Sequence, residues 1–458
     1  MRNKICLITF ALSCLTLSLQ AQTLQQDIDG LIEQTLPHAN VGIFIKDAQS
    51  GKVLYQRNAN KLFSPASNIK MLTAAAALYH LGPKDRYTTS LSRANNNVYI
   101  TFSGSPALKT NDLKKLLQNV TTIKGNIVLD ASQFKPPYYA AGTTYDDVGW
   151  YYNAPSSAII LNGNAMAYDF ISAKTLGKLI EIKPAPSNKG LTIVNNVITV
   201  NKIQEKEHCN LNIQIEPNNT LRLYGCFSQQ EKPQKMQLAI PNPALYAKQL
   251  IKSIVKENHI SLGGKVVEGH KPPNATLIAT HQSDELATLL KHMMLESDNL
   301  YADSVTKRLA HSLTGEGTYK QGAFAIKQIL AKHTHLDIKQ LELMDGVGTR
   351  YNMITPKQMG VFLTDIYQDK TIKPIFLNTL PQMGVSGTLK YRMKDTRLEN
   401  NVLAKTGSMH DISALSGYLL LPNGRTIIFS IICNNLMESS KAKSLEDKIL
   451  LATYTKLA

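Results

Sequence analysis

Apolar and polar residues form two distinct periodic patterns near the start of the chain. Residues 41–45 and 52–56 are short apolar-rich runs separated by a Gly-containing turn, which predicts two strands joined as a hairpin. Residues 67–81 are rich in Ala and have the apolar spacing of a helix, and the Gly-Pro pair that follows ends the pattern. We therefore expect a hairpin followed by an apolar helix.

The pattern changes between residues 86 and 282, where turn signals interrupt short apolar runs. Asn-rich turns at 95–97, 195–196 and 217–219 each predict a hairpin, and one stretch, 244–257, has helical spacing. This part of the chain is therefore expected to be a β-rich block.

Helical patterns return beyond the β-rich block, together with two apolar strands. The expected helices cover 285–295, 319–333 and 441–457, and the strands cover about 415–421 and 426–433. No internal repeat or low-complexity tract is evident. A chain with this mixture of elements is of the α+β class.

The N-terminal segment has the layout of a secretory signal peptide. Arg2 and Lys4 precede an apolar run over 5–19, and Ala21 supplies a small residue for cleavage. The run is too short to span a bilayer comfortably. A retained anchor or lipidation at Cys14 is the alternative. We therefore predict export to the periplasm with cleavage near Ala21.

Composition and charge narrow the class of protein. The 458 residues are 43% apolar and 18% charged, which excludes a disordered, collagenous or polytopic membrane protein. This length suggests about three domains. The formal net charge is +16, and loss of the leader with its two basic residues lowers it to +14. A basic protein favours an anionic partner, and export argues against nucleic acid as that partner.

Three cysteines remain after the leader. Residues 210–225 alternate like two strands around a Pro-Asn-Asn turn, and a turn centred on the Pro-Asn pair places Cys209 opposite Cys226. We therefore predict a disulfide between these two cysteines, the alternative being two free thiols. Cys433 lies inside an apolar strand and is expected to be buried and free.

Candidate chemistry begins at the start of the first predicted helix, with Ser67-Asn-Ile-Lys70. A Lys three residues after a Ser lies on the same helix face, within reach of the hydroxyl. The free amides and positive dipole end at a helix start favour oxyanion charge and lower the pKa of a nearby amine. The pattern is weak alone, because Ser253, Ser304 and Ser440 also begin Ser-x-x-Lys tetrads.

Two further motifs raise the significance of the Ser67 tetrad. Ser297-Asp-Asn299 is the only Ser-x-Asn in the chain, and Lys405-Thr-Gly407 is the only Lys-Ser/Thr-Gly. Their order after Ser67 is the one found in active-site serine enzymes that act on penicillin-like and D-Ala-D-Ala substrates. The alternative is a solvated turn at Ser297 and an ordinary edge-strand lysine at Lys405.

With these motifs, the sequence resembles the D-alanyl-D-alanine carboxypeptidase/endopeptidase family of low-molecular-mass class C penicillin-binding proteins, over essentially the whole mature chain. The similarity extends to residues 63–68, 102–106, 125–130, 154–158, 297–302, 387–389, 404–407 and 413–417. One departure lies at 345–348, which reads Asp-Gly-Val-Gly where family members usually have Asp-Gly-Ser-Gly. That departure removes a serine hydroxyl from this loop.

The resemblance implies a split fold, in which a β-rich insertion of one or two small domains interrupts a β-lactamase/transpeptidase-like catalytic domain. That domain is an antiparallel sheet packed by helices. The spacing agrees, because Ser67 and Ser297 must meet in one cleft and lie half a chain apart. The expected ranges are 1–21 for the signal peptide, 22–85 and 283–458 for the catalytic domain, and 86–282 for the insertion.

The resemblance also implies catalytic roles for five residues. Ser67 would attack the carbonyl of the penultimate D-Ala, and Lys70 would take the serine proton. Ser297 would relay that proton to the leaving amine. Asn299 would hold Lys70 and the substrate amide, and Lys405 would supply positive potential.

The implied substrate contacts come mainly from the third motif. Thr406, Gly407 and Ser408 would bind the substrate, with the two hydroxyls holding its terminal carboxylate. The backbone amides of Ser67 and Ser408 would form the oxyanion hole. A partner for the third stem-peptide residue is expected in the insertion, and our candidate is the acidic pair Asp146-Asp147, with Asp147 as the binding residue. The alternative is an exposed acidic turn.

The implied function is a serine D-Ala-D-Ala carboxypeptidase/endopeptidase that acts on peptidoglycan stem peptides through an acyl-enzyme, with β-lactams as covalent inhibitors. No cofactor, metal or nucleic acid is expected. The alternatives are a β-lactamase, for which a large β-rich insertion is unneeded, and a catalytically idle wall-binding protein, which the intact motifs disfavour. The sequence leaves open the balance of the two activities, the third stem residue, the oligomeric state and any association with the membrane or wall.

Overall fold

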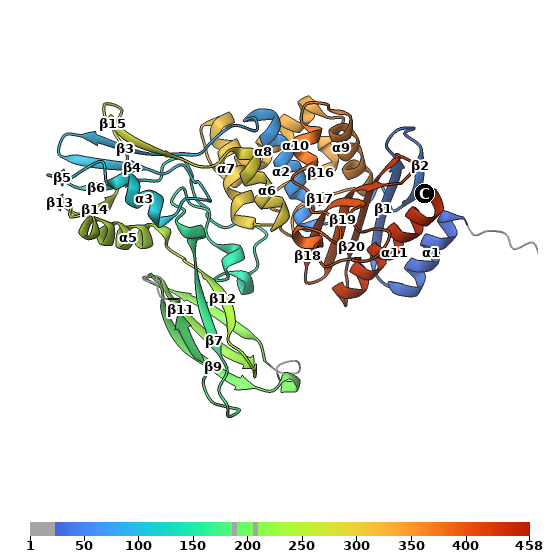
Figure 1. Cartoon of the computed structure of the whole chain (residues 1–458), viewed down its shortest axis with the longest axis horizontal. Coiled ribbons are helices and arrows are strands. Elements are labelled where there is room, and N and C mark those ends of the chain that lie inside the picture. Colours follow the sequence, from blue (N-terminus) through green and yellow to red (C-terminus); the bar gives the residue numbers. More distant parts are fainter. Residues whose placement is uncertain (1–22, 186–189, 205–208) are drawn as a thin grey trace, which may run out of the picture.

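The computed structural model describes residues 23–185, 190–204 and 209–458. The predicted signal peptide lies outside the described residues. Figure 1 shows an elongated molecule, with a helix-covered sheet at one end and β-rich lobes at the other. Within the described ranges, no helix is both long and apolar enough to cross a membrane.

One five-stranded antiparallel sheet lies at the right-hand end of the molecule in Figure 1. The N-terminal hairpin and the two late strands lie together in it, as predicted. The second and third strands from its edge, β19 and β20, are buried on both faces, which explains their continuous apolar sequence. The order is β18 (Val402–Met409), β19 (Ile412–Leu420), β20 (Thr426–Asn434), β1 (Asn40–Asp47) and β2 (Val53–Arg57).

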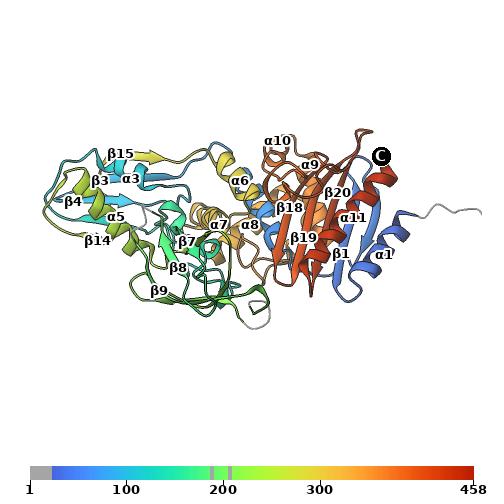
Figure 2. The same cartoon turned by 60° about the horizontal axis from the view of Figure 1, so that its bottom comes forward.

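Helices pack on both faces of this sheet (Figure 2). One face is covered by α1 (Leu24–Thr35) and α11 (Ser439–Leu457). The predicted helices at 67–81, 285–295, 319–333 and 441–457 are confirmed, whereas the sequence patterns did not predict α1, α7 or α9. The helices on the other side are α2 (Ile69–His80), α6 (Leu286–Leu295), α7 (Asn299–Thr314), α8 (Tyr319–His333), α9 (Pro356–Gln368) and α10 (Lys373–Leu377), with the short strands β16 (Leu341–Glu342) and β17 (Met353–Ile354).

The β-rich end of the molecule contains a second five-stranded sheet, which is mixed. Its order is β14 (Val266–Glu268), β6 (Ile127–Asp130), β4 (Asn97–Thr101), β3 (Thr88–Ala94) and β15 (Thr276–Gln282). The elements packed around it are α3 (Thr110–Leu117), α5 (Pro243–Glu257), β5 (Thr122–Ile123) and β13 (Ser261–Leu262).

Two three-stranded sheets form a lobe that projects downwards in Figure 1. Apolar residues of this lobe and of the mixed sheet belong to one continuous core. The first lobe sheet contains β12 (Gln234–Ala239), β7 (Ala165–Ile171) and β8 (Glu181–Pro184), and the second contains β10 (Leu211–Glu216), β11 (Thr220–Ser228) and β9 (Thr192–Val200).

The strand pairing supports an insertion. Among the described residues, every strand from β3 to β15 pairs only with other strands of that set. The strands of the helix-covered sheet come from the two ends of the chain. We therefore propose that 86–282 is inserted between 22–85 and 283–458.

The predicted turns in the β-rich block have mixed outcomes. The hairpin at 95–97 is confirmed, because Asn95 turns the chain between β3 and β4 with a φ of 50°. The prediction at 195–196 is wrong, because both asparagines lie inside β9, which pairs in parallel with β11. An Asn-Asn pair can thus lie within a strand when a neighbouring strand pairs with its backbone N–H and C=O groups.

The disulfide between Cys209 and Cys226 is confirmed, and Cys433 is buried and free. The register that led to the disulfide prediction is wrong by one residue, since Leu211 pairs with Gly225. The reason is a three-residue turn in which both asparagines adopt positive φ, in place of a two-residue turn.

Candidate active site

Ser67 lies in a single 3-10 turn, η1 (Ala66–Asn68), directly before α2. Lys70 follows in the first turn of α2, and its Nζ lies 2.7 Å from Ser67 Oγ. Ala66 has a φ of 46°, a backbone conformation that costs energy in a residue with a side chain. The turn that presents Ser67 is therefore held in a strained conformation by its surroundings.

The Lys70 side chain is fully buried, and its amine has three hydrogen-bond partners. Besides Ser67 Oγ, Nζ contacts Asn299 Oδ1 at 2.8 Å and the carbonyl oxygen of Val347 at 3.0 Å. These two oxygens can only accept, so they use the two hydrogens of a neutral amine and leave its lone pair for the serine proton. Burial lowers the pKa of Lys70 to about 8, although nearby carboxylates such as Asp303 oppose the shift.

The Ser-x-Asn motif occupies the bend between two helices. α6 ends at Leu295 and α7 begins at Asn299, with Asp298 accepting a hydrogen bond from the backbone of Tyr301 as the helix cap. Ser297 Oγ accepts a hydrogen bond of 2.8 Å from Lys405. The bend thus directs the serine and the asparagine of the motif towards the two buried lysines.

Asn299 contacts both sides of the cleft. Its Oδ1 accepts from Lys70, and its Nδ2 donates a hydrogen bond of 2.8 Å to the backbone carbonyl of Tyr152. An amide nitrogen carries two hydrogens, so one remains for a ligand.

Lys405 and Gly407 lie on β18, the edge strand beside the turn of Ser67. Lys405 is fully buried, and its Nζ donates to Ser297 Oγ and to the carbonyl of Thr406. A Cβ atom at Gly407 would lie 2.5 Å from the carbonyl oxygen of Pro65. Only glycine therefore lets the strand approach the turn this closely.

The two buried lysines affect each other's charge. Burial, and after it the proximity of Lys70, lowers the pKa of Lys405 well below its ordinary value. Each ammonium makes a second one less favourable, so the site favours one protonated and one neutral amine. Positive potential from Lys405 therefore requires Lys70 to be the neutral member of the pair.

The loop that departs from the family pattern contacts Lys70 through its backbone. Asp345 is buried, and its carboxylate accepts from the backbone N–H groups of Val347 and Gly348, both at 2.8 Å. The hydroxyl of Thr349 also donates to Asp345. These bonds orient the Val347 carbonyl towards Lys70, so this contact does not depend on a serine side chain.

A cavity of about 480 Å³ opens beside Ser67. Asp146, Asp147 and Arg350 all line it, which gives the cavity two acidic side chains and one basic side chain. Asp147 accepts from the hydroxyls of Thr144 and Tyr152, and Arg350 pairs with Asp411 at 2.8 Å. Of these residues, the sequence predicted only the acidic pair.

Of the three substrate-binding residues predicted on β18, only Ser408 lines this cavity. Ser408 is exposed. Thr406 is half-buried, and its hydroxyl donates to that of Thr388 at 2.8 Å. Thr388 lies in η6 (Gly387–Leu389), one of the segments that resemble the family.

A third buried lysine, Lys307 of α7, supports the segment that forms the opposite side of the cleft. Its Nζ donates to three backbone carbonyls, those of Lys135 and Ser156 at 3.1 Å and that of Pro137 at 2.8 Å. Asp303 lies one helical turn away, and burial raises the pKa of its carboxyl. Sequence patterns did not reveal this role, because a single lysine in a helix carries no signal of its carbonyl partners.

The structure brings the predicted motif residues together and leaves the other tetrads elsewhere. Ser253 is exposed on α5, and Ser440 is at the start of α11. Ser304 is buried, and its hydroxyl donates to the carbonyl of Gly104. Within the described ranges, no three His, Cys, Asp or Glu side chains form a group suited to a metal ion.

Comparison with known proteins gives matches over nearly the whole chain. Residues 24–455 match the D-Ala-D-Ala carboxypeptidase 3 (S13) family. D-alanyl-D-alanine carboxypeptidase DacB of Haemophilus influenzae is 29% identical over 87% of this chain and 86% of its own length. D-alanyl-D-alanine carboxypeptidase of an Actinomadura species is 27% identical over 90% and 81%.

The fold is also similar to that of a solved structure. The crystal structure of penicillin binding protein 4 (dacB) from Haemophilus influenzae superposes with a TM-score of 0.85 at 27% identity, covering 94% of this chain and 99% of that one. The same protein has been solved in complex with a β-lactam, and that structure gives a TM-score of 0.79 at 26% identity, covering 93% and 99%.

Proposed function

The chain belongs to the D-Ala-D-Ala carboxypeptidase 3 (S13) family and is a penicillin-sensitive serine carboxypeptidase, and from that premise we propose which residues carry out its reaction. The observation that carries the proposal is the 2.7 Å contact between Lys70 Nζ and Ser67 Oγ. A hydroxyl becomes a nucleophile when a neutral base lies within hydrogen-bond reach of its proton.

Acylation begins at Ser67. Its Oγ attacks the carbonyl carbon of the penultimate D-Ala, and its proton passes to the neutral amine of Lys70. Asn299 Oδ1 and the Val347 carbonyl hold that amine in place. The negative charge that develops on the substrate oxygen is stabilised by the backbone amides of Ser67 and Ser408.

Departure of the terminal D-Ala requires a proton on its nitrogen. Ser297 supplies that proton as the carbon–nitrogen bond breaks, and the network of Lys405 and Lys70 restores it to the serine. The leaving amine thus departs neutral, and the acyl group remains on Ser67. Water then hydrolyses the ester and regenerates the enzyme.

Recognition of the free C-terminus falls to β18. The hydroxyls of Thr406 and Ser408 bind the terminal carboxylate, and Gly407 keeps this strand close to Ser67. A penicillin presents a carboxylate and a reactive carbonyl to the same groups, so its acyl group is transferred to Ser67. This explains why penicillins inhibit such an enzyme covalently.

The cavity beside Ser67 is our candidate site for the third residue of the stem peptide. Asp147 offers a carboxylate to a side-chain amine, and Arg350 offers a guanidinium to a side-chain carboxylate. A third stem residue that carries both an amine and a carboxylate could pair with Asp147 and with Arg350. Asp147, chosen from the sequence alone, is thus proposed as a specificity residue.

The proposed place of action is outside the cytoplasm. The N-terminal pattern favours export to the periplasm with cleavage near Ala21, where peptidoglycan stem peptides are available. The net positive charge suits an anionic wall polymer. We propose cleavage of cross-links, a DD-endopeptidase activity, as a second reaction of the same site.

The test is release of D-Ala from a pentapeptide stem by wild-type protein and by Ser67→Ala. We expect release by the wild type and a loss of at least about 10³-fold in the variant, because the nucleophile is absent. Ser253→Ala, in an exposed tetrad on α5, is the matched control and should retain full activity. Equal rates in the wild type and Ser67→Ala would refute the assignment.

A further inference from the structure

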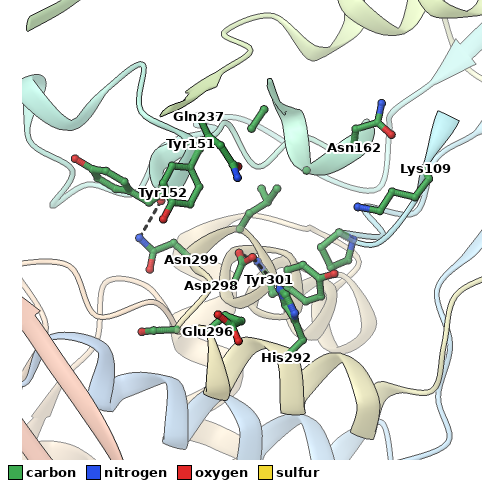
Figure 3. Close-up of a pocket in the computed structure, with 15 residues that line it drawn as sticks. Lys109, Tyr151, Tyr152, Asn162, Gln237, His292, Glu296, Asp298, Asn299 and Tyr301 are labelled. Carbon is green, nitrogen blue, oxygen red and sulfur yellow. Dashed lines mark hydrogen bonds and ion pairs between the residues drawn. The ribbon is translucent and has the colours of Figure 1, made fainter. Parts of the chain in front are cut away.

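A second cavity, of about 430 Å³, lies on the other side of the Ser-x-Asn motif. Figure 3 shows it between helices of the catalytic half and segments of the inserted block. Ser297 lines this cavity, whereas Ser67 lines only the first. Tyr152 and Asn299 line both, so the two cavities meet at this pair.

The position of the second cavity relates it to the leaving side of the scissile bond. The first cavity extends from Ser67 past Ser408 to His410, beyond the amide that would hold the oxyanion. That direction suits the acyl part of a stem peptide. The second cavity begins at Ser297, the proposed proton donor to the leaving nitrogen. A group that departs with that nitrogen therefore lies at its entrance.

The size of the second cavity exceeds what a single D-Ala requires. Pockets for drug-sized ligands are about 300–1,000 Å³, and this cavity falls in that range. A leaving group made of one small amino acid leaves most of it empty. A leaving group made of a whole stem peptide, as in a cross-link, would occupy it.

Two charged side chains of opposite sign line the cavity besides Asp298, which pairs with His292 at 3.1 Å. Glu296 lies next to Ser297, and Lys109 lies on the opposite wall, contributed by the inserted block. Among the described residues, neither charged group has an ion-pair or hydrogen-bond partner for its side chain. Figure 3 shows the Lys109 amine pointing into the cavity, and Gln237 pointing into it from above.

We propose that this cavity, called here the leaving-strand pocket, binds the second stem peptide of a cross-link. The inference rests on the proposed function. Glu296 attracts the amine released next to Ser297, and Lys109 binds a free carboxylate further along the departing stem. Tyr151, which is 50% exposed at the wall, offers an aromatic surface to the peptide between them.

The chemical step in a cross-link is the same as at a free end. The amide between the D-Ala carbonyl and the side-chain amine of the neighbouring stem breaks, Ser297 protonates that amine, and water later completes hydrolysis of the ester. The pocket therefore adds binding energy for one substrate class without altering the reacting groups. Substitutions in the pocket should therefore weaken the binding of cross-linked stems and leave D-Ala release from uncross-linked stems unchanged.

Two variants of the inserted block test the leaving-strand pocket. Lys109→Met removes the charge while keeping side-chain length, and Gln237→Trp fills the space from an exposed position of β12. Lys115→Met, an exposed lysine on α3 outside the pocket, is the matched control. Each protein is assayed on an uncross-linked pentapeptide and on a cross-linked tetrapeptide dimer, prepared once without its sugars and once with them.

We expect Lys109→Met and Gln237→Trp each to lower kcat/KM on the dimer by about tenfold, mainly through KM, with D-Ala release from the pentapeptide within about twofold of wild type. Lys115→Met should match the wild type on both substrates. The inference is overturned if both substrates are affected equally, if the dimer is unaffected, if the wild type does not cleave the dimer, or if sensitivity to Lys109→Met appears only when the dimer carries its sugars. Failure of the wild type to release D-Ala from the pentapeptide would instead refute the proposed function.

Discussion

Two Ser-x-x-Lys tetrads with buried lysines, one at the start of α2 and one on α7, have the same spacing and different chemistry. Lys70 and Lys307 are both fully buried. Lys70 contacts a serine hydroxyl and two acceptor oxygens, which suits a neutral amine. Lys307 donates to three carbonyls, which can only accept, so it requires all three hydrogens of an ammonium.

The difference teaches that burial alone does not make a lysine a base. In the Ser67 tetrad the serine hydroxyl faces the amine, whereas Ser304 turns its hydroxyl to the carbonyl of Gly104. The first tetrad therefore provides proton transfer. The second anchors the ends of the segment that bears Asp147 and Tyr152, the inserted side of the cleft. One lysine serves the reaction, and the other positions the surface that recognises the substrate.

The largest expected effect comes from Lys70→Met. Loss of the base should slow acylation by penicillin by at least about 10³-fold. The free energy of unfolding should fall less than in the corresponding Lys307 variant, because only two oxygens, those of Asn299 and Val347, lose a donor and no ammonium is removed. Stopped-flow acylation and denaturant unfolding measure the two quantities. Acylation of this variant at the wild-type rate would contradict the role of Lys70 as the base.

The pH dependence of acylation is the second expected effect. The neutral form of Lys70 is the active one, and a pKa lowered to about 8 means that its neutral fraction grows as the pH rises towards that value. The acylation rate should increase about tenfold from pH 6 to pH 7 and level off above about 8. A rate that is flat or falling over this range would contradict a neutral Lys70.

Lys307→Met should act on stability and recognition. Removal of the ammonium leaves three carbonyls without their donor and Asp303 without its nearby positive charge, which should lower the free energy of unfolding by about 3–5 kcal/mol. The KM for a pentapeptide should rise more than kcat falls, because the supported segment lines the cleft. Lys332→Met, an exposed lysine on α8, is the control. Unchanged stability and KM would refute the anchoring role.

Asp147→Asn should have the smallest and most selective effect. Loss of the carboxylate should lower kcat/KM about tenfold for stem peptides with an amine on the third residue, and leave peptides without that amine unaffected. Glu231→Gln, an exposed acidic residue outside the cavity, controls for a general change in charge. An equal loss of kcat/KM on both kinds of peptide would show that Asp147 does not recognise the side-chain amine of the third residue.

Much of the catalytic half could be predicted from the sequence because its signals are local. The hairpin of β1 and β2, the helix after Ser67 and the apolar strands β19 and β20 each follow from spacing along the chain. α7 could not, because its buried face carries Asp303, Ser304 and Lys307, which a hydrophobic pattern does not detect. The inserted block supplies the carbonyl partners of Ser304 and Lys307, and Tyr319 of α8 supplies the partner of Asp303.

The site could be predicted as far as its side chains lie within motifs. Ser67, Ser297 and Lys405 are named by the three motifs, and their proximity follows from the resemblance. The contact of Lys70 with the Val347 carbonyl could not be predicted, because a backbone group carries no residue signature. The roles of Arg350 and Lys109 could not be predicted either, because only the folded chain brings these isolated charges to the two cavities.

The most direct test of the central claim is the site of acylation. Wild-type protein, Ser67→Ala and Ser253→Ala are incubated with fluorescent penicillin, digested and read by mass. The account predicts one adduct on the peptide that carries Ser67 in the wild type and in Ser253→Ala, and none in Ser67→Ala. Persistent labelling of Ser67→Ala at the wild-type stoichiometry would contradict it.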